Sequence, residues 1–138
     1  MKHWKALTAI ATLALMATAA DAKQMPSGRP TPLELAALPD YCQARFGEDQ
    51  AARQAFARRL GTKHYLHIHH HCVGLNLLNR SMVTVDRNTK RYYLQQAINE
   101  FNYVLARWPK DFALTAEAET GKARAATMLT GVPGGRRY

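Results

Sequence analysis

The clearest pattern of apolar and polar positions lies in the segment RYYLQQAINEFNYVLARWP, residues 91–109. Apolar side chains recur there at the i, i+3, i+4, i+7 spacing that places them on one face of a helix. These positions are Leu94, Ala97, Ile98, Phe101, Val104, Leu105 and Trp108. Proline cannot continue a helix, because it lacks the amide hydrogen and its ring collides with the preceding turn. The pattern therefore predicts one amphipathic helix that ends before Pro109.

Two shorter helices are predicted earlier in the chain. The segment TPLELAALPDYCQARFG begins with Thr31 as an N-cap and Pro32 in the first turn, and it ends at Gly47. Pro39 should break or bend this segment. The next segment, EDQAARQAFARRLG, has acids at its start, two arginines near its end and Gly61 as terminator. That order suits the helix dipole.

Two further helices complete the prediction. From Thr62, a predicted cap, KHYLHIHHHCVGLNLLNRSM has the length and apolar content of a buried helix, whereas VTVDRNTK after it lacks a helical period and predicts a loop. A last helix is expected from about Phe112 to Leu129. No run of alternating residues is long enough for a sheet. The predicted fold class is all-α, with four to five helices as stacked antiparallel hairpins in a single domain over residues 33–131.

The beginning of the chain predicts a compartment. Residues 1–22, MKHWKALTAIATLALMATAADA, have two lysines before a short apolar run and small residues at the end. This is the pattern of a secretory signal peptide, so the protein is expected to be periplasmic or secreted. Residues 23–32 are expected to form a flexible lead-in, and residues 132–138 a flexible basic tail. No segment after the leader approaches the roughly 18 apolar residues that a membrane span needs, so no transmembrane segment is expected in the mature chain.

The charge of the chain narrows the choice of partners. The protein has 138 residues and a formal net charge of +9 at pH 7. A basic field attracts polyanions in general. Because an exported protein rarely meets chromosomal DNA, nucleic acid is not expected as a partner. The remaining candidate partners are an anionic surface, an acidic polysaccharide or an acidic protein. A second interpretation assigns the charge to solubility alone.

Cys42 and Cys72 are the only cysteines. Exported proteins meet oxidising conditions, so a single disulfide is the first interpretation. It would close a loop of about 30 residues and add about 3 kcal/mol to the stability of a small domain on the chain-entropy estimate. Two buried free thiols and a functional cysteine are the alternatives.

Part of the strongest helix also matches a repeat pattern. Its small, aromatic, small and proline positions are Ala97, Phe101, Val104 and Pro109. Their spacing is similar to that in the second helix of a tetratricopeptide repeat, and Val73-Gly74 followed by Leu77 can take the places of its first helix. Residues 64–130 therefore resemble one such repeat and a capping helix, with an insertion of about 11 residues within NRSMVTVDRNTK. The resemblance implies stacked helical hairpins that bind a peptide or protein in a concave groove. A plain helical bundle is the alternative.

The stretch HYLHIHHHC, residues 64–72, holds five of the six histidines in the chain. On a helix all five cannot converge on one ion, but His64, His67 and His71 lie along one flank. An i, i+4 pair of histidines is the geometry of helical zinc, copper or nickel sites, so these three are the candidate metal ligands. Packing of half-buried histidines is the first interpretation, metal binding the second, and a pH-sensitive or partner-facing surface the third.

Each catalytic motif that the sequence partly resembles lacks an essential residue. A zinc protease needs Glu after the first histidine, where this chain has Ile68, and haem attachment needs a closely spaced cysteine pair. The fragment AEAETGKA has Ala116 where a phosphate loop needs its first glycine. We therefore expect a non-enzymatic, exported protein that binds a protein or peptide of the bacterial cell envelope and needs no cofactor. The alternative is a metal-binding or metal-handling protein that uses the histidines of residues 64–71.

Overall fold

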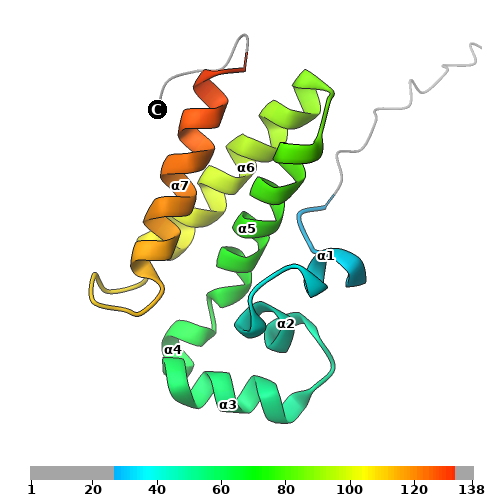
Figure 1. Cartoon of the computed structure of the whole chain (residues 1–138). Coiled ribbons are helices and arrows are strands. Elements are labelled where there is room, and N and C mark those ends of the chain that lie inside the picture. Colours follow the sequence, from blue (N-terminus) through cyan, green and yellow to red (C-terminus); the bar gives the residue numbers. More distant parts are fainter. Residues whose placement is uncertain (1–26, 133–138) are drawn as a thin grey trace, which may run out of the picture.

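The computed structural model describes residues 27–132, and over this range the protein is all-helical (Figure 1). The helices are α1 (Pro32–Ala36), α2 (Asp40–Phe46), α3 (Gln50–Leu60), α4 (Thr62–Tyr65), α5 (Ile68–Val83), α6 (Arg87–Leu105) and α7 (Thr115–Thr130). The predicted all-α class is confirmed, with seven helices in the described range in place of four to five. The predicted leader, residues 1–22, and residues 133–138 of the predicted tail lie outside that range. Within it, no helix combines the length and apolar character needed to cross a membrane.

The core is built by α5, α6 and α7, which run antiparallel to one another in chain order (Figure 1). α6 packs against both of the others. The residues that α6 buries most deeply are those predicted to share one face: Leu94, Ala97, Ile98, Phe101 and Val104. The helix ends at Leu105, before the predicted stop at Pro109. The amphipathic pattern therefore identified both the helix and its buried face.

Phe101 explains how closely α5 and α7 approach α6. Its ring is fully buried. A Cβ atom on Gly74 of α5 would lie 2.9 Å from Phe101 Cε1, and one on Gly121 of α7 would lie 2.5 Å from Phe101 Cζ. Both distances are shorter than real Cβ contacts, so a side chain at either position needs the ring to move. The two glycines thus set the separation of the three core helices.

The connection between α5 and α6 is shorter than predicted. Only residues 84–86 lie outside the helices, whereas VTVDRNTK, residues 83–90, predicted a loop. Asp86 accounts for the difference, because its side chain accepts a hydrogen bond from the Thr89 amide at 2.8 Å and caps α6. The expected insertion of about 11 residues is therefore mostly additional helix at the ends of α5 and α6.

The histidine segment is two helices and not one. α4 ends at Tyr65 and α5 begins at Ile68, and Thr62 is the first residue of α4 while Gly61, with a φ of 81°, precedes it. The carbonyl of His64 accepts a hydrogen bond from Nε1 of Trp108 at 3.1 Å. It also accepts from the amide of residue 67, three positions later, which is the pattern of a tightened turn. This tertiary contact at the end of α4 accompanies the break and is not visible in a sequence pattern.

The predicted breaks in the first helical segment are confirmed. Thr31 and Glu34 form a capping box at the start of α1, and Pro39 separates α1 from α2. Gly47 ends α2 as expected, and Asp49 caps α3. α2 packs against α5, whereas α3 buries none of its residues and packs against its neighbours α2 and α4. α3 and α4 therefore form one end of the molecule, below the core in Figure 1.

The described part of the predicted lead-in, from residue 27, is held against α5. Arg80 donates hydrogen bonds to two carbonyls of this segment and forms an ion pair with Glu34 at 2.6 Å. The buried Asn76 donates to the Gly28 carbonyl at 3.2 Å. Hydrogen bonds from Arg80 lower the pKa of the Glu34 carboxyl to about 2. The flexibility of the lead-in remains a prediction, and α5 supplies hydrogen-bond partners for the backbone of its described residues.

Candidate functional site

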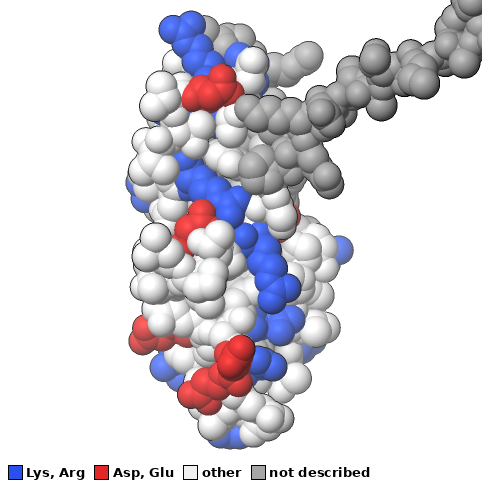
Figure 2. Space-filling model, turned by 90° about the vertical axis from the view of Figure 1, so that its right-hand side faces the viewer, with Lys and Arg blue, Asp and Glu red and all other residues white. Residues whose placement is uncertain are grey.

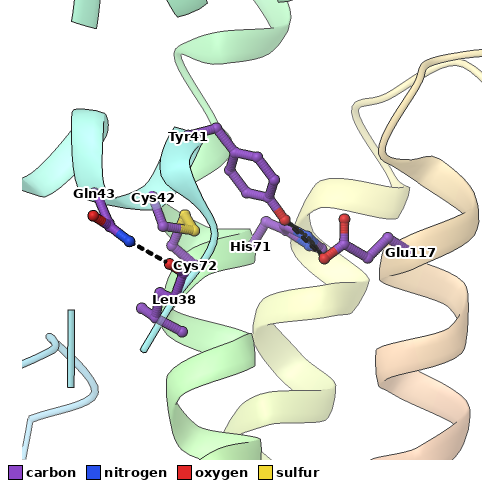
Figure 3. Close-up of a disulfide and its surroundings, with 7 residues drawn as sticks. All are labelled: Leu38, Tyr41, Cys42, Gln43, His71, Cys72 and Glu117. Atoms are coloured by element: carbon purple, nitrogen blue, oxygen red, sulfur yellow. Dashed lines mark hydrogen bonds and ion pairs between the residues drawn. A yellow bond between two sulfur atoms is a disulfide. The ribbon is translucent and has the colours of Figure 1, made fainter. Parts of the chain in front are cut away.

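A disulfide joins α2 to α5, as predicted. The Cα atoms of Cys42 and Cys72 are 5.6 Å apart, and both side chains are fully buried. The residue before each cysteine carries a polar ring, Tyr41 in α2 and His71 in α5. Because the bridge joins the two cysteines, it also brings these rings together, with centroids 6.0 Å apart (Figure 3).

Glu117 of α7 completes a cluster with Tyr41 and His71 (Figure 3). The Tyr41 hydroxyl donates a hydrogen bond to Glu117 Oε1 at 2.7 Å. His71 Nε2 lies 3.3 Å from the same hydroxyl oxygen and 3.7 Å from Glu117 Oε1. The His71 side chain is 0% exposed and that of Glu117 is 41% exposed. The cluster therefore links α2, α5 and α7 and presents its carboxylate at the surface.

The hydrogen bonds indicate where the protons of this cluster lie. The Tyr41 hydroxyl has one hydrogen, which it gives to Glu117. The bond between this hydroxyl oxygen and His71 Nε2 must therefore be donated by the histidine. The other ring nitrogen of His71, Nδ1, is buried without a hydrogen-bond partner in the described part of the chain. A ring with its proton on Nε2 leaves Nδ1 as a bare acceptor, so no buried N–H is unsatisfied.

The two oxygen groups of the cluster both have pKa values shifted away from neutral pH. The neighbouring His71, and then the hydrogen bond from Tyr41, lower the pKa of the Glu117 carboxyl against the opposing effect of burial. Burial and the neighbouring carboxylate raise the pKa of the Tyr41 hydroxyl. A carboxylate with a lowered pKa is a weak base, and a phenol with a raised pKa is a weak acid. The arrangement instead connects three helices and holds one carboxylate in a fixed position.

Glu117 borders a groove between α5 and α7. The groove has a volume of about 370 Å³ and is lined by Leu75, Leu78, Ala116, Glu117, Thr120, Gly121 and Arg124. The two leucines come from α5, and the small, polar and charged residues come from α7. Arg124 follows Glu117 by about two helical turns, or about 10 Å along the axis. Among the described residues, its guanidinium has one hydrogen-bond partner, the sulfur of Met82 at 3.7 Å.

The three histidines predicted as metal ligands have separate surroundings. The ring of His64 packs on Phe112, with centroids 4.8 Å apart. His67 lies beside Tyr103, whose hydroxyl oxygen is 3.3 Å from Nδ1, and His71 is part of the buried cluster. The break between α4 and α5 removes the continuous helical flank on which the three were placed together. In the part of the chain that the structure describes, no group of three or more His, Cys, Asp or Glu side chains is arranged to hold a metal ion.

The remaining two histidines of the segment also have partners. His70 stacks on Tyr103 with centroids 3.6 Å apart, and its Nδ1 lies 2.6 Å from Glu100 Oε2. The guanidinium of Arg107 lies 3.6 Å from the centroid of the same tyrosine, so the Tyr103 ring is covered on both faces. His69 Nδ1 is 3.0 Å from a backbone carbonyl of the preceding turn. These contacts are those that the packing interpretation of the histidines predicts.

Sequence reasoning missed Tyr41 and Glu117. A signal for Tyr41 was present, because a disulfide between Cys42 and Cys72 also brings their preceding residues together. Glu117 carried no such signal. It lies 76 positions from Tyr41, and only the packing of α7 places it there.

Comparison with protein-family models, with curated proteins and with solved structures finds no match to this chain. The fold and the site define an all-α domain with one disulfide and a groove between two core helices.

Proposed function

We propose that the protein is an exported, non-enzymatic binding protein of the bacterial cell envelope, and that it binds a partner protein or peptide in the groove between α5 and α7. The lining of the groove is the main evidence for this proposal. Its leucine floor offers apolar contact, its wall includes the small residues Ala116 and Gly121, and Glu117 and Arg124 add charges of opposite sign. A hollow of about 370 Å³ accommodates a few side chains of a peptide and not a globular surface.

The construction of the walls supports the same proposal. α5 and α7 both pack on α6, and the Tyr41 hydrogen bond fixes Glu117 relative to the disulfide. A groove with fixed walls loses little conformational entropy when a ligand binds, which favours affinity. The antiparallel succession of α5, α6 and α7 is also compatible with the resemblance to a tetratricopeptide repeat, whose function is partner binding.

The proposed compartment rests on two independent features. Residues 1–22 have the pattern of a signal peptide. The buried Cys42–Cys72 bridge is of the kind that persists under oxidising conditions. Together they favour the cell envelope as the place where the partner is found.

Site-specific photocrosslinking in cells tests the proposal. A photoreactive amino acid at Thr120, which is exposed and lines the groove, should yield one crosslinked partner that mass spectrometry identifies. The matched control is Asn102, which is also exposed but lines a separate hollow between α6 and α7. The groove position should crosslink and the control position should not. The same products from both positions, or none from Thr120, would argue against the groove as the binding site.

A further inference from the structure

Two hollows beside the hairpin formed by α2 and α3 differ in the charge of their lining residues. On one side, a hollow of about 460 Å³ is bordered by the acidic residues Asp40, Glu48 and Asp49. On the other side, a hollow of about 260 Å³ is bordered by Arg45 and Arg53 and has no acidic residue in its lining. Figure 2 presents one face of the molecule, on which acidic and basic side chains both lie towards the end formed by α3 and α4. The second hollow, called here the basic hollow, differs from the first because its charged lining residues are all basic.

The basic hollow is otherwise mostly apolar. Besides the two arginines it is lined by Gln54, Ala57, Thr62, Tyr65 and Leu66. Leu66, which lines the hollow, is 61% exposed. The hydroxyl of Tyr65 and Nε of Arg45 are buried without hydrogen-bond partners within the described range. The guanidinium of Arg53 donates hydrogen bonds to the carbonyls of Ala44 and Gly47 at 3.5 and 2.6 Å. The hollow thus combines an exposed apolar side chain with two positively charged side chains.

Two exposed basic residues extend this surface. Arg58 follows Gln54 of the hollow by four positions, so it lies one turn further along the same side of α3. Lys63 precedes Leu66 by three positions and shares its side of the short α4 segment. Among the described residues, no ion pair joins either side chain to a carboxylate. Their charges are therefore available to an external anion.

The position of this surface decides what kind of anion fits it. α3 buries none of its residues, and α3 and α4 together form an end of the molecule (Figure 1). Because Arg58 and Lys63 are exposed beside the hollow and do not line it, a planar partner can meet both of these side chains and the exposed Leu66 at the same time. Lysine and arginine near a membrane gain about 1 kcal/mol each from anionic headgroups, and an exposed leucine enters the interface. We propose that the basic hollow, with Arg58 and Lys63, binds the surface of anionic phospholipid membranes.

This surface is separate from the groove between α5 and α7. Its lining comes from α2, α3 and the α4 region, and the groove lining comes from α5 and α7. Membrane binding through α3 and α4 therefore leaves the groove open to a partner. Membrane binding by this surface and partner binding by the groove can each occur without the other.

Vesicle co-sedimentation of the chain from Lys23 onward, the mature form that the leader predicts, tests the proposal. The probes are vesicles of phosphatidylcholine alone and of phosphatidylcholine mixed with phosphatidylglycerol. We expect binding to the mixed vesicles only, and release at about 0.5 M salt, where screening is nearly complete at contact distances. The double variant Arg58→Ala/Lys63→Ala should bind about 30-fold more weakly, from the loss of two headgroup contacts.

The matched control is Arg87→Ala/Lys90→Ala, which removes an arginine and a lysine from the first turn of α6, at the other end of the molecule from α3 and α4 (Figure 1). It should bind the mixed vesicles as the unmodified protein does, and circular dichroism should show equal helix content for both variants. Equal weakening of the two double variants would overturn the proposal, because net charge alone would then explain binding. Equal binding to both vesicle types, or none to either, would also overturn it, and the second result would direct the search for a partner to acidic proteins.

Discussion

Glu117 accepts a hydrogen bond from the buried Tyr41 and lies 3.7 Å from Nε2 of the buried His71, while part of its own side chain faces solvent. This arrangement makes its carboxylate both a structural link and an exposed charge. The pKa of Glu117 is lowered in the folded protein, chiefly by the neighbouring His71. A carboxyl whose folded pKa is depressed contributes stability above its ordinary pKa and loses that contribution as pH falls through the folded value. The free energy of unfolding should therefore include a contribution from Glu117 that is lost at acidic pH.

The substitution Glu117→Gln tests this contribution. Above about pH 5 we expect the variant to be about 0.5–1 kcal/mol less stable in urea unfolding, because a hydrogen bond to a charged acceptor is stronger but solvent screens this partly exposed carboxylate. The difference should shrink as pH falls through the lowered folded pKa of Glu117, because the carboxylate of the unmodified protein then gains its proton. Glu119→Gln, at an exposed position on the same helix, is the control and should change little. A difference that does not vary with pH would contradict the assignment.

Gly121 is the second residue on which the core geometry depends. Alanine stabilises most helical positions relative to glycine by about 1 kcal/mol. At residue 121, however, its Cβ would lie 2.5 Å from the Phe101 ring, so we expect Gly121→Ala to destabilise the protein by about 1–3 kcal/mol. The control is Gly131→Ala, whose Cβ would lie 3.5 Å from its nearest neighbour, an ordinary contact. Thermal unfolding of both variants measures the effect, and a stabilised Gly121→Ala protein would show that the Phe101 ring can move freely.

At the scale of the elements, the disulfide joins two parts of the molecule whose helices pack to different extents. α6 packs extensively on α5 and α7, whereas α1–α4 reach this core mainly through α2 and the Cys42–Cys72 bridge. Opening a loop of about 30 residues costs about 3–4 kcal/mol on the chain-entropy estimate. We expect reduction to loosen α1–α3 first and to leave α5–α7 helical.

Hydrogen exchange followed by mass spectrometry checks this expectation. Peptides from residues 32–60 should lose protection on reduction, while peptides from residues 87–130 should keep most of theirs. The oxidised protein, carried through the same steps without reductant, is the control. Uniform loss of protection along the chain would mean that the two parts unfold as one cooperative unit.

The elements also show what a sequence pattern can and cannot predict. The buried face of α6 and the division at Pro39 were predictable, because each follows from local periodicity or local stereochemistry. The division between α4 and α5 was not, because it accompanies a hydrogen bond from Trp108, 44 positions away from His64. The proximity of Tyr41 and His71 was predictable, because the leader and the two cysteines predict a disulfide that brings the preceding residues together. Its third member, Glu117, was not, since only the packing of α7 brings it to Tyr41.

At the scale of the whole molecule, export remains a prediction with a direct measurement. We expect the protein, expressed with its own leader, to be recovered from the envelope fraction with Lys23 as its first residue. Intact mass spectrometry determines the N-terminus, and resistance of both cysteines to alkylation without reductant determines the bridge. A chain that retains Met1 and stays in the cytoplasm would contradict the prediction.

The groove and the basic hollow together give the molecule two separate surfaces. The groove belongs to the α5–α7 core, and the basic hollow belongs to the end formed by α3 and α4. These two parts are connected through α2, the disulfide and the short α4–α5 junction. A protein held to a membrane through one end can therefore present its groove at a defined height above the lipid.

Trp108 gives this molecule an internal optical reporter. The chain has two tryptophans, and the other, Trp4, belongs to the predicted leader, so the form that begins at Lys23 has a single indole. Trp108 is 5% exposed, its ring centroid lies 5.4 Å from that of His71, and Nε1 is bonded to the carbonyl of His64. Fluorescence excited selectively in the indole thus originates at one point, where α4 and α5 meet the end of α6. The wavelength and intensity of that emission follow the opening of this junction without any added label.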